Sequence, residues 1–253
     1  MQDGRGAEGR EAYERSKAIC EALLAASPGE RDVAAQYAGT LKRLGTLSIS
    51  EKRLSEANGL FTKALEVEQD LLAKNPADRN IRFAITHTLS DLGYVQRESG
   101  QLDEALRFYQ DALRRLESAL NEDTGNQRAR GGVAAILNDL GGVYAQLAWF
   151  PQCRDSYERA LSLREEVLRR TPDSRSSELA VAQTRADFAE ALLEEAARSL
   201  TGSQKTIALQ RARNLLRQAL PVYEDRAAKK ELLGRDIEKP EQIRALIARV
   251  GQM

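Results

Sequence analysis

Three Leu-Gly pairs recur along this chain at a constant interval of 48 residues. They are Leu44-Gly45, Leu92-Gly93 and Leu140-Gly141, and Phe188-Ala189 falls one interval later. A fixed period of this size is typical of stacked copies of one small unit rather than of a closed globule around a central pocket. The repeat therefore favours an interaction scaffold over a self-contained enzyme.

Further columns of residues keep the same interval. They comprise a small residue at Ala57, Ala105 and Cys153, an aromatic ring at Tyr13, Phe61, Tyr109 and Tyr157, an Ala-Leu pair at 64–65, 112–113 and 160–161, and Pro28, Pro76 and Pro172, with Thr124 in the remaining copy. Several independent columns in one register exclude chance and define a single repeating unit.

Each unit is predicted to be a helix, a short turn and a second helix. In the copy that starts near residue 79, apolar residues spaced three or four apart indicate one helix up to about residue 99, and Gly100 is typical of a helix end. A second apolar stripe starts at Leu102. Glycine in a helix interior costs about 1 kcal/mol relative to alanine, so the repeated Leu-Gly glycine predicts a close helix contact. We expect the aromatic column to fill the space between units.

The period divides the chain into four helix pairs with flanking segments. In the fourth copy the columns of the second helix match only after 11 extra residues, which we assign to a longer turn around residues 199–206. The predicted boundaries are a flexible leader at 1–8, a repeat domain at 9–230 with an orphan helix at 9–27 and pairs at 30–75, 78–123, 126–171 and 174–230, and a tail at 231–253 with a capping helix.

Composition narrows the function classes. The chain has 38 basic and 38 acidic residues, and this balance argues against binding to nucleic acid or to an anionic membrane. No apolar run is long enough to predict membrane insertion. Cys20 and Cys153 lie far apart and predict two buried, reduced thiols. We expect a cytoplasmic location or, alternatively, an extracytoplasmic segment of a membrane-anchored parent protein.

Motifs for catalysis are missing from the sequence. His87 is the only histidine, so a Ser-His-Asp triad would depend on a residue in mid-helix. One histidine and two separated cysteines cannot supply a four-ligand zinc site. Gly4, Gly6 and Gly9 match a nucleotide-loop pattern, but no strand precedes them. We therefore predict no enzyme activity, no metal and no cofactor.

The columns resemble the tetratricopeptide repeat (TPR). Leu92-Gly93, Gly100, Ala105, Tyr109 and Ala112 reproduce its order and spacing, and the excess of 14 residues over a 34-residue unit equals about two turns on each helix. The resemblance implies an all-α, right-handed α-solenoid of antiparallel helix pairs. The 48-residue arrays are also similar to segments C-terminal to bacterial eukaryotic-type Ser/Thr protein kinases, which implies a role in bacterial signalling.

In the resembled family the first helices of the pairs line a groove that holds a peptide or a partner helix. By resemblance, the groove residues of this chain are Lys42, Thr46, His87, Ser90, Tyr94, Arg97, Asn138, Gly142, Ala145, Gln183 and Glu190. Some members grip a C-terminal carboxylate with Lys and Asn, a mode that only Lys42 and Asn138 could serve here.

The sequence leaves the role of two other possible contact surfaces undecided. Trp149 lies at a helix-helix turn and is either an interface anchor or folded onto its own turn. The orphan first helix leaves one end of the stack open, so a homo-oligomer through that end is the alternative to a peptide-binding or protein-binding scaffold.

Overall fold

The regular structure of this protein is entirely helical. In the computed structural model, the backbone is described for residues 3–232 and 234–250 and the side chains for 8–232 and 236–250, and no strand occurs within these ranges. The elements are α1 (Asp3–Ala26), α2 (Arg31–Ser50), α3 (Leu54–Lys74), α4 (Arg79–Glu98), α5 (Leu102–Glu122), α6 (Gln127–Gln146), α7 (Phe150–Arg170), α8 (Arg175–Arg198), α9 (Gly202–Ala228), the 3-10 helix η1 (Gly234–Glu238) and α10 (Lys239–Val250).

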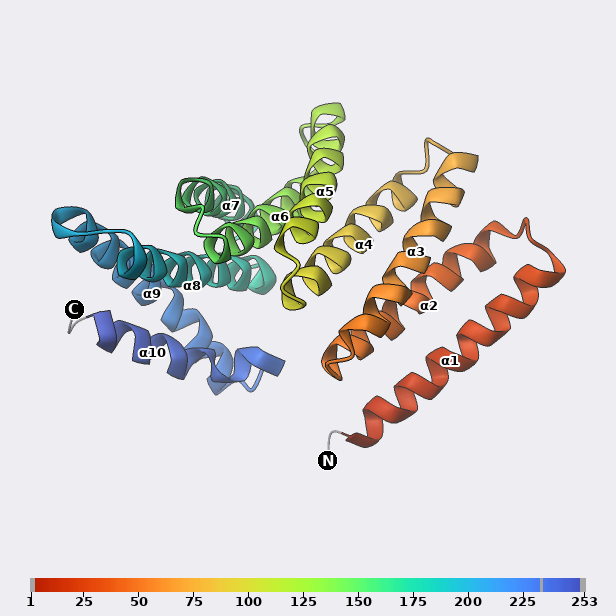
Figure 1. Ribbon diagram of the computed structural model, residues 1–253, viewed down its shortest axis with the longest axis horizontal. Coiled ribbons are helices and arrows are strands. Elements are labelled where there is room, and N and C mark those ends of the chain that lie inside the picture. Colours follow the sequence, from red (N-terminus) through yellow and green to blue (C-terminus); the bar gives the residue numbers. More distant parts are fainter. Residues whose placement is uncertain (1–2, 233, 251–253) are drawn as a thin grey trace. The chain divides into compact units, whose positions relative to one another are not determined.

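The helices form consecutive packed pairs (Figure 1). The chain divides into two compact units at residues 118 and 119, within α5. In unit 1, α2 pairs with α3, and α4 packs against α3. In unit 2, α6 pairs with α7 and α8 with α9. The prediction of an all-α solenoid built from helix pairs is confirmed.

The first helix, α1, has the place of a second helix in a pair. It packs against α2 in the same way that α3 packs against α4. The Arg10 guanidinium donates to Ser48 Oγ at 3.1 Å, and one repeat later Gln96 Nε2 donates to Asn58 Oδ1 at 2.9 Å, which joins the corresponding helices. Arg10 also bonds Glu51 and Glu56 at 3.0 and 3.2 Å. These contacts fasten the start of α1 to the turn between α2 and α3.

The repeated glycines bring the two helices of a pair together. A Cβ atom added to Gly45, Gly93 or Gly141 would lie only 2.7–2.8 Å from the ring of Phe61, Tyr109 or Tyr157, respectively. The close contact predicted from the Leu-Gly column is therefore present. The aromatic ring lies inside its own pair, where it faces the glycine, and the Tyr157 ring also stacks on Phe188 of the next pair at 5.3 Å. The prediction that placed the ring only between units is incomplete.

Helix starts and tight turns also follow the repeat. The side chains of Asp78, Asn126 and Ser174, spaced 48 residues apart, accept hydrogen bonds from backbone N–H groups at the starts of α4, α6 and α8. Inside the pairs, Gly100 takes a left-handed φ of 76°. Lys52 and Ala148 occupy the same turn position with φ of 59° and 57°, although they carry a Cβ.

The element bounds differ from the sequence analysis at both ends of the repeat region. Helix α1 begins at Asp3, within the segment expected to be a flexible leader. The 11 extra residues do not form a longer turn, because only residues 199–201 separate α8 from α9. Instead α8 is 24 residues long and α9 is 27 residues long, against 20 and 21 for α6 and α7, and α9 starts seven residues earlier relative to its aligned column.

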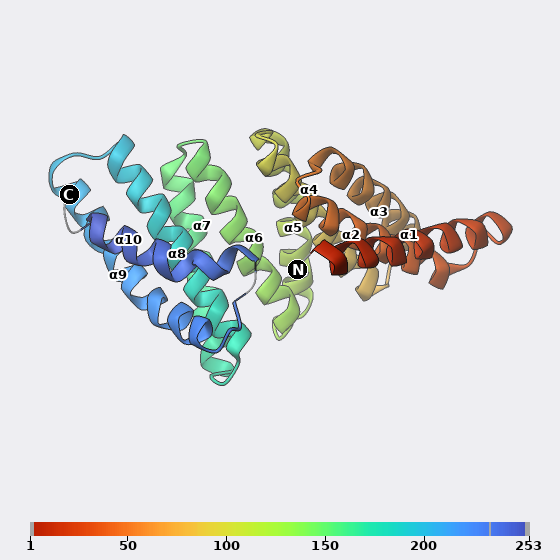
Figure 2. The same cartoon turned by 90° about the horizontal axis from the view of Figure 1, so that it is seen from below.

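The C-terminal segment packs onto the fourth pair. Helix α10 lies against α9 (Figure 2). Its buried residues Ile243 and Val250 belong to the core cluster that includes residues of α8 and α9. Pro240 is also buried. The helix expected at 240–250 is thus present as α10, and its apolar side covers part of the last pair.

Candidate partner-binding faces

Helix α4 carries four of the expected groove residues in one stripe. His87, Ser90, Tyr94 and Arg97 follow one another at spacings of three and four, so they lie on one side of the helix. His87 is exposed, and the other three are partly buried. The Arg97 guanidinium lies over the Tyr94 ring at 5.2 Å from its centroid and donates to Glu98 at 3.2 Å. The stripe combines one aromatic ring with polar groups, a composition suited to holding an extended backbone with one apolar anchor.

Helix α2 contributes Lys42 and Thr46 to unit 1. The Lys42 ammonium donates to Glu68 Oε1 at 2.5 Å, and Thr88 Oγ1 donates to Glu68 Oε2 at 2.7 Å. Glu68 is only 2% exposed, and a buried carboxylate needs such partners to offset its lost hydration. Lys42 therefore holds an internal carboxylate that joins α2, α3 and α4. Thr46 is exposed, and its hydroxyl donates to the backbone carbonyl of Lys42 at 3.0 Å.

Unit 2 carries the remaining groove residues, on α6 and α8. Asn138 is buried, and its amide donates to Asp187 Oδ2 at 3.0 Å, which ties α6 to α8. Ala145 is buried in the core of this unit, whereas Gly142 and Gln183 are partly buried. Glu190 is exposed, and its carboxylate accepts a hydrogen bond from Lys239 of α10 at 3.1 Å. The C-terminal segment thus already contacts one of the expected binding residues.

A partly buried cation, Arg164, takes the place of Glu68 two repeats later. Arg164 donates to the carbonyl of Ala180 at 2.6 Å and also bonds the Thr184 hydroxyl. Burial lowers the pKa of Arg164, and burial followed by the nearby Asp187 raises the pKa of Tyr223. In the repeat between them the same position is Leu116, which is buried. These groups face the interior of the pairs and have a structural role.

Trp149 folds back onto its own turn. Its ring stacks on Tyr144 of α6 with centroids 5.9 Å apart, and 45% of the residue stays exposed. The two cysteines are free and buried. Burial, followed by the charge of Glu195, raises the pKa of the Cys153 thiol to about 12, which makes this thiol unreactive near neutral pH.

The expected groove residues are divided between the two units. Lys42, Thr46 and the α4 stripe belong to unit 1 and are called the unit 1 face below. Asn138, Gly142, Ala145, Gln183 and Glu190 belong to unit 2, where Asn138 and Ala145 are buried. Within the described residues, no group of three or more His, Cys, Asp or Glu side chains is placed to hold a metal ion. No helix in that part of the chain is long and apolar enough to cross a membrane.

A cleft between α1 and α2 was missed by the sequence analysis. It has a volume of about 600 Å³ and is lined mainly by apolar side chains, among them Ile19, Cys20, Leu23 and Val33. The available signal was the orphan helix itself, because a second helix without its first helix leaves apolar positions uncovered. The sequence analysis noted this open end but did not assign residues to it.

Comparisons with known proteins agree with this architecture. The model of the tetratricopeptide repeat family matches residues 86–124, which span most of α4 and α5. No curated protein matches the chain. The crystal structure of BtubC (BKLC) from P. vanneervenii is similar, with a TM-score of 0.58 and 17% identity over 98% of this chain and 91% of that chain.

Two further solved structures are more distant. They are a monomeric mutant of IFIT1 with Gppp-AAAA, with a TM-score of 0.46 and 18% identity over 94% of this chain and 42% of that chain, and Nro1, described as a nuclear import adaptor, with a TM-score of 0.45 and 13% identity over 96% and 81%. The family match and the repeated helix pairs together identify the fold as a TPR-like helical array.

Proposed function

We propose that this chain is a scaffold that binds a protein or peptide, and that the unit 1 face, with the α4 stripe at its centre, is the binding surface. The observation that carries the proposal is the Arg97 guanidinium packed on the Tyr94 ring, at a position expected to face the groove in a first helix. A partly buried aromatic ring gives an apolar anchor at low entropic cost.

The polar groups around this ring complement an extended chain. Ser90 and His87 lie one and two turns before Tyr94 on the same side of α4, and the exposed Thr46 belongs to the neighbouring first helix. Hydroxyl and imidazole groups can donate to and accept from a peptide backbone. Because Lys42 is held by Glu68, we propose recognition through the peptide backbone and one apolar side chain rather than through a carboxylate clamp.

The test uses a phage-displayed random peptide library selected on the whole chain, followed by fluorescence polarisation with the enriched peptides. We expect Tyr94→Ala and Ser90→Arg each to weaken binding by about tenfold or more. Arg114→Ala is the matched control, since Arg114 is an exposed residue of α5 in the same unit. Equal affinities for wild type and both stripe variants would refute the proposed surface.

We further propose that the scaffold works within a bacterial signalling protein of the kinase-associated type that its 48-residue register resembles. Sequencing the complete source gene and its neighbours tests this proposal. A protein-kinase catalytic domain in the same product or an adjacent gene supports it, and a context without any signalling domain contradicts it.

A further inference from the structure

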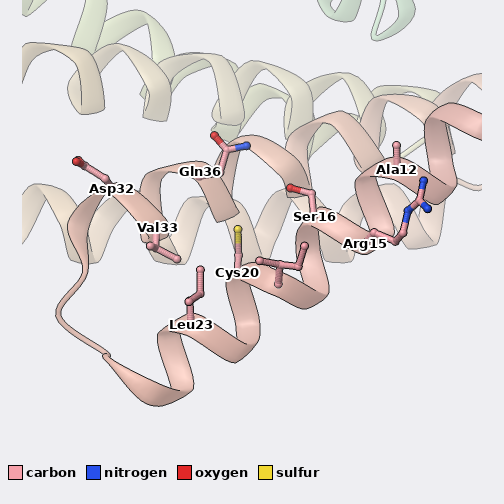
Figure 3. Close-up of a pocket in the computed structure, with 9 residues that line it drawn as sticks. Ala12, Arg15, Ser16, Cys20, Leu23, Asp32, Val33 and Gln36 are labelled. Carbon is pink, nitrogen blue, oxygen red and sulfur yellow. The ribbon is translucent and has the colours of Figure 1, made fainter.

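The apolar cleft between α1 and α2 is an unfilled copy of a contact that recurs inside the array. Figure 3 shows Leu23, Cys20 and Ser16 on α1 facing Val33 and Gln36 on α2. One repeat later the corresponding residues are Leu71, Glu68 and Ala64 on α3 and Ile81 on α4, at the same interval of 48. The two sites therefore have the same local construction and differ in what covers them.

The exposed fraction of the matched residues shows the difference. Leu23 is 48% exposed, whereas Leu71 is 4% exposed, and Ile19 is 60% exposed. At the internal site, the first helix α2 supplies the cover. Its residues Tyr37, Ala38 and Leu41 share a core cluster with Ala64, and Gly45 lies against the Phe61 ring.

We propose that the α1–α2 cleft binds one amphipathic helix from outside residues 1–253, which takes the place of the first helix of a pair. The internal contact defines the helix that fits. It carries an aliphatic or aromatic residue, a small residue, a leucine and a glycine in the register of Tyr37, Ala38, Leu41 and Gly45. The glycine would lie over the Tyr13 ring, which corresponds to the Phe61 ring.

Among the described residues, the first helices of a second copy are not free to fill the cleft. The first helices α2, α6 and α8 are packed against α3, α7 and α9, and α4 is joined to α5 through Gly93 and Tyr109. Exposing any of them would open a pair and lose its buried core. A second copy could therefore supply a first helix only by opening one of its own pairs, and this binding mode is independent of the face proposed for peptides on α4.

The chemistry of the cleft also restricts the partner. At the position of Glu68, which needs Lys42 from the covering helix, α1 has the uncharged Cys20. The partner helix therefore needs a small uncharged residue at the Lys42 position, as Ser90 is in α4. The α4 sequence has Ile85, Thr86, Leu89 and Gly93 at the four register positions, and it combines them with the small, uncharged Ser90.

The experiment titrates a fluorescein-labelled peptide with the sequence of residues 79–98 into the whole chain and follows fluorescence polarisation. We expect saturable binding, and we expect Leu23→Glu to weaken it by about tenfold or more because a carboxylate would be buried without a partner. Leu23 is half exposed in the free chain, so this variant keeps its fold. Ile207→Glu is the matched control, since Ile207 is 67% exposed and lies in unit 2.

The outcomes separate the possible occupants. A peptide in which Leu89 is replaced by Glu is expected to bind at least about tenfold more weakly than the parent peptide. Absence of saturable binding by the parent peptide, or equal binding to wild type and Leu23→Glu, would overturn the proposal. A concentration-dependent dimer that Leu23→Glu converts to a monomer would also overturn it, because the cleft would then belong to a second copy. A failure of the Tyr94→Ala test of the proposed function would not affect the binding of this helix to the cleft, because the two surfaces are tested by different variants.

Discussion

Replacing Gly93 by alanine tests the explanation for the Leu-Gly column most directly. The new Cβ would lie 2.8 Å from Tyr109 Cε1 and 2.9 Å from both Cδ1 and Cζ, all on one ring. Tyr109 is fully buried at 0% exposure, so the ring cannot turn into solvent. The two helices of the pair must move apart to accept the methyl group.

The expected change in stability is the difference between two effects. Alanine improves helix propensity over glycine by about 1 kcal/mol. Adding a methyl group to a tightly packed interior costs about 1–3 kcal/mol, and three ring atoms closer than 3.0 Å place this site at the upper end. We therefore expect Gly93→Ala to lower the free energy of unfolding by about 2 kcal/mol.

A second glycine in the same unit supplies the control. Gly59 lies inside α3, and a Cβ added there meets no atom within 4 Å. Only the propensity gain applies, so Gly59→Ala is expected to raise the free energy of unfolding by about 0.5–1 kcal/mol. Urea unfolding followed by far-ultraviolet circular dichroism measures both variants as shifts in midpoint at constant slope. If Gly93→Ala is as stable as Gly59→Ala, the close-packing explanation is wrong.

The other predictions concern the internal ion pair, a capping residue and a turn. Lys42→Met leaves the buried Glu68 carboxylate without its ammonium partner and is expected to lower the free energy of unfolding in urea by about 2–4 kcal/mol. The double variant Lys42→Met with Glu68→Leu is expected to recover most of that loss. A double variant that recovers none of it would contradict the structural role given to this ion pair. A hydrogen bond from Arg31 and others from backbone N–H groups lower the pKa of Asp78, so its charge stabilises the fold above the unfolded value of about 4 and the benefit is lost as the pH falls through the lower folded value. The stability difference between wild type and Asp78→Asn should therefore shrink in acid, and a difference that is constant with pH would count against it. Ala148→Gly relieves a left-handed φ of 57° and is expected to raise the thermal midpoint through a gain of about 1 kcal/mol; a lower midpoint would show that the turn is not strained.

Much of the fold could be predicted because the repeat supplies several independent copies of each signal. The Leu-Gly and aromatic columns located the helix pairs, and the glycine contact followed from the cost of glycine in a helix. The capping column at Asp78, Asn126 and Ser174 has the same interval and could have been found in the same way. Periodicity is informative here because each pair packs only against its neighbours.

The candidate site could be predicted only in part, because whether a polar side chain is available to a ligand depends on which other side chains of the protein it already binds. Lys42 and Asn138 have the residue types of a carboxylate clamp, but Glu68 and Asp187 bind them internally. These partners come from other helices at separations that no local pattern reveals. Likewise, the 11 extra residues extended α8 and α9 as helix because Ala, Glu, Gln and Lys favour helix over turn.

The charge reversal between Glu68 and Arg164 has a consequence for assembly. Similar repeats risk pairing with the wrong neighbour while the chain folds. If the helix bearing Lys42 were to dock where Asn138 belongs, its ammonium would take the position opposite the Arg164 guanidinium, and two like charges would be brought together at a partly buried site. We infer that this charge reversal disfavours an exchange of these two first helices during folding, a distinction that the apolar columns alone do not make.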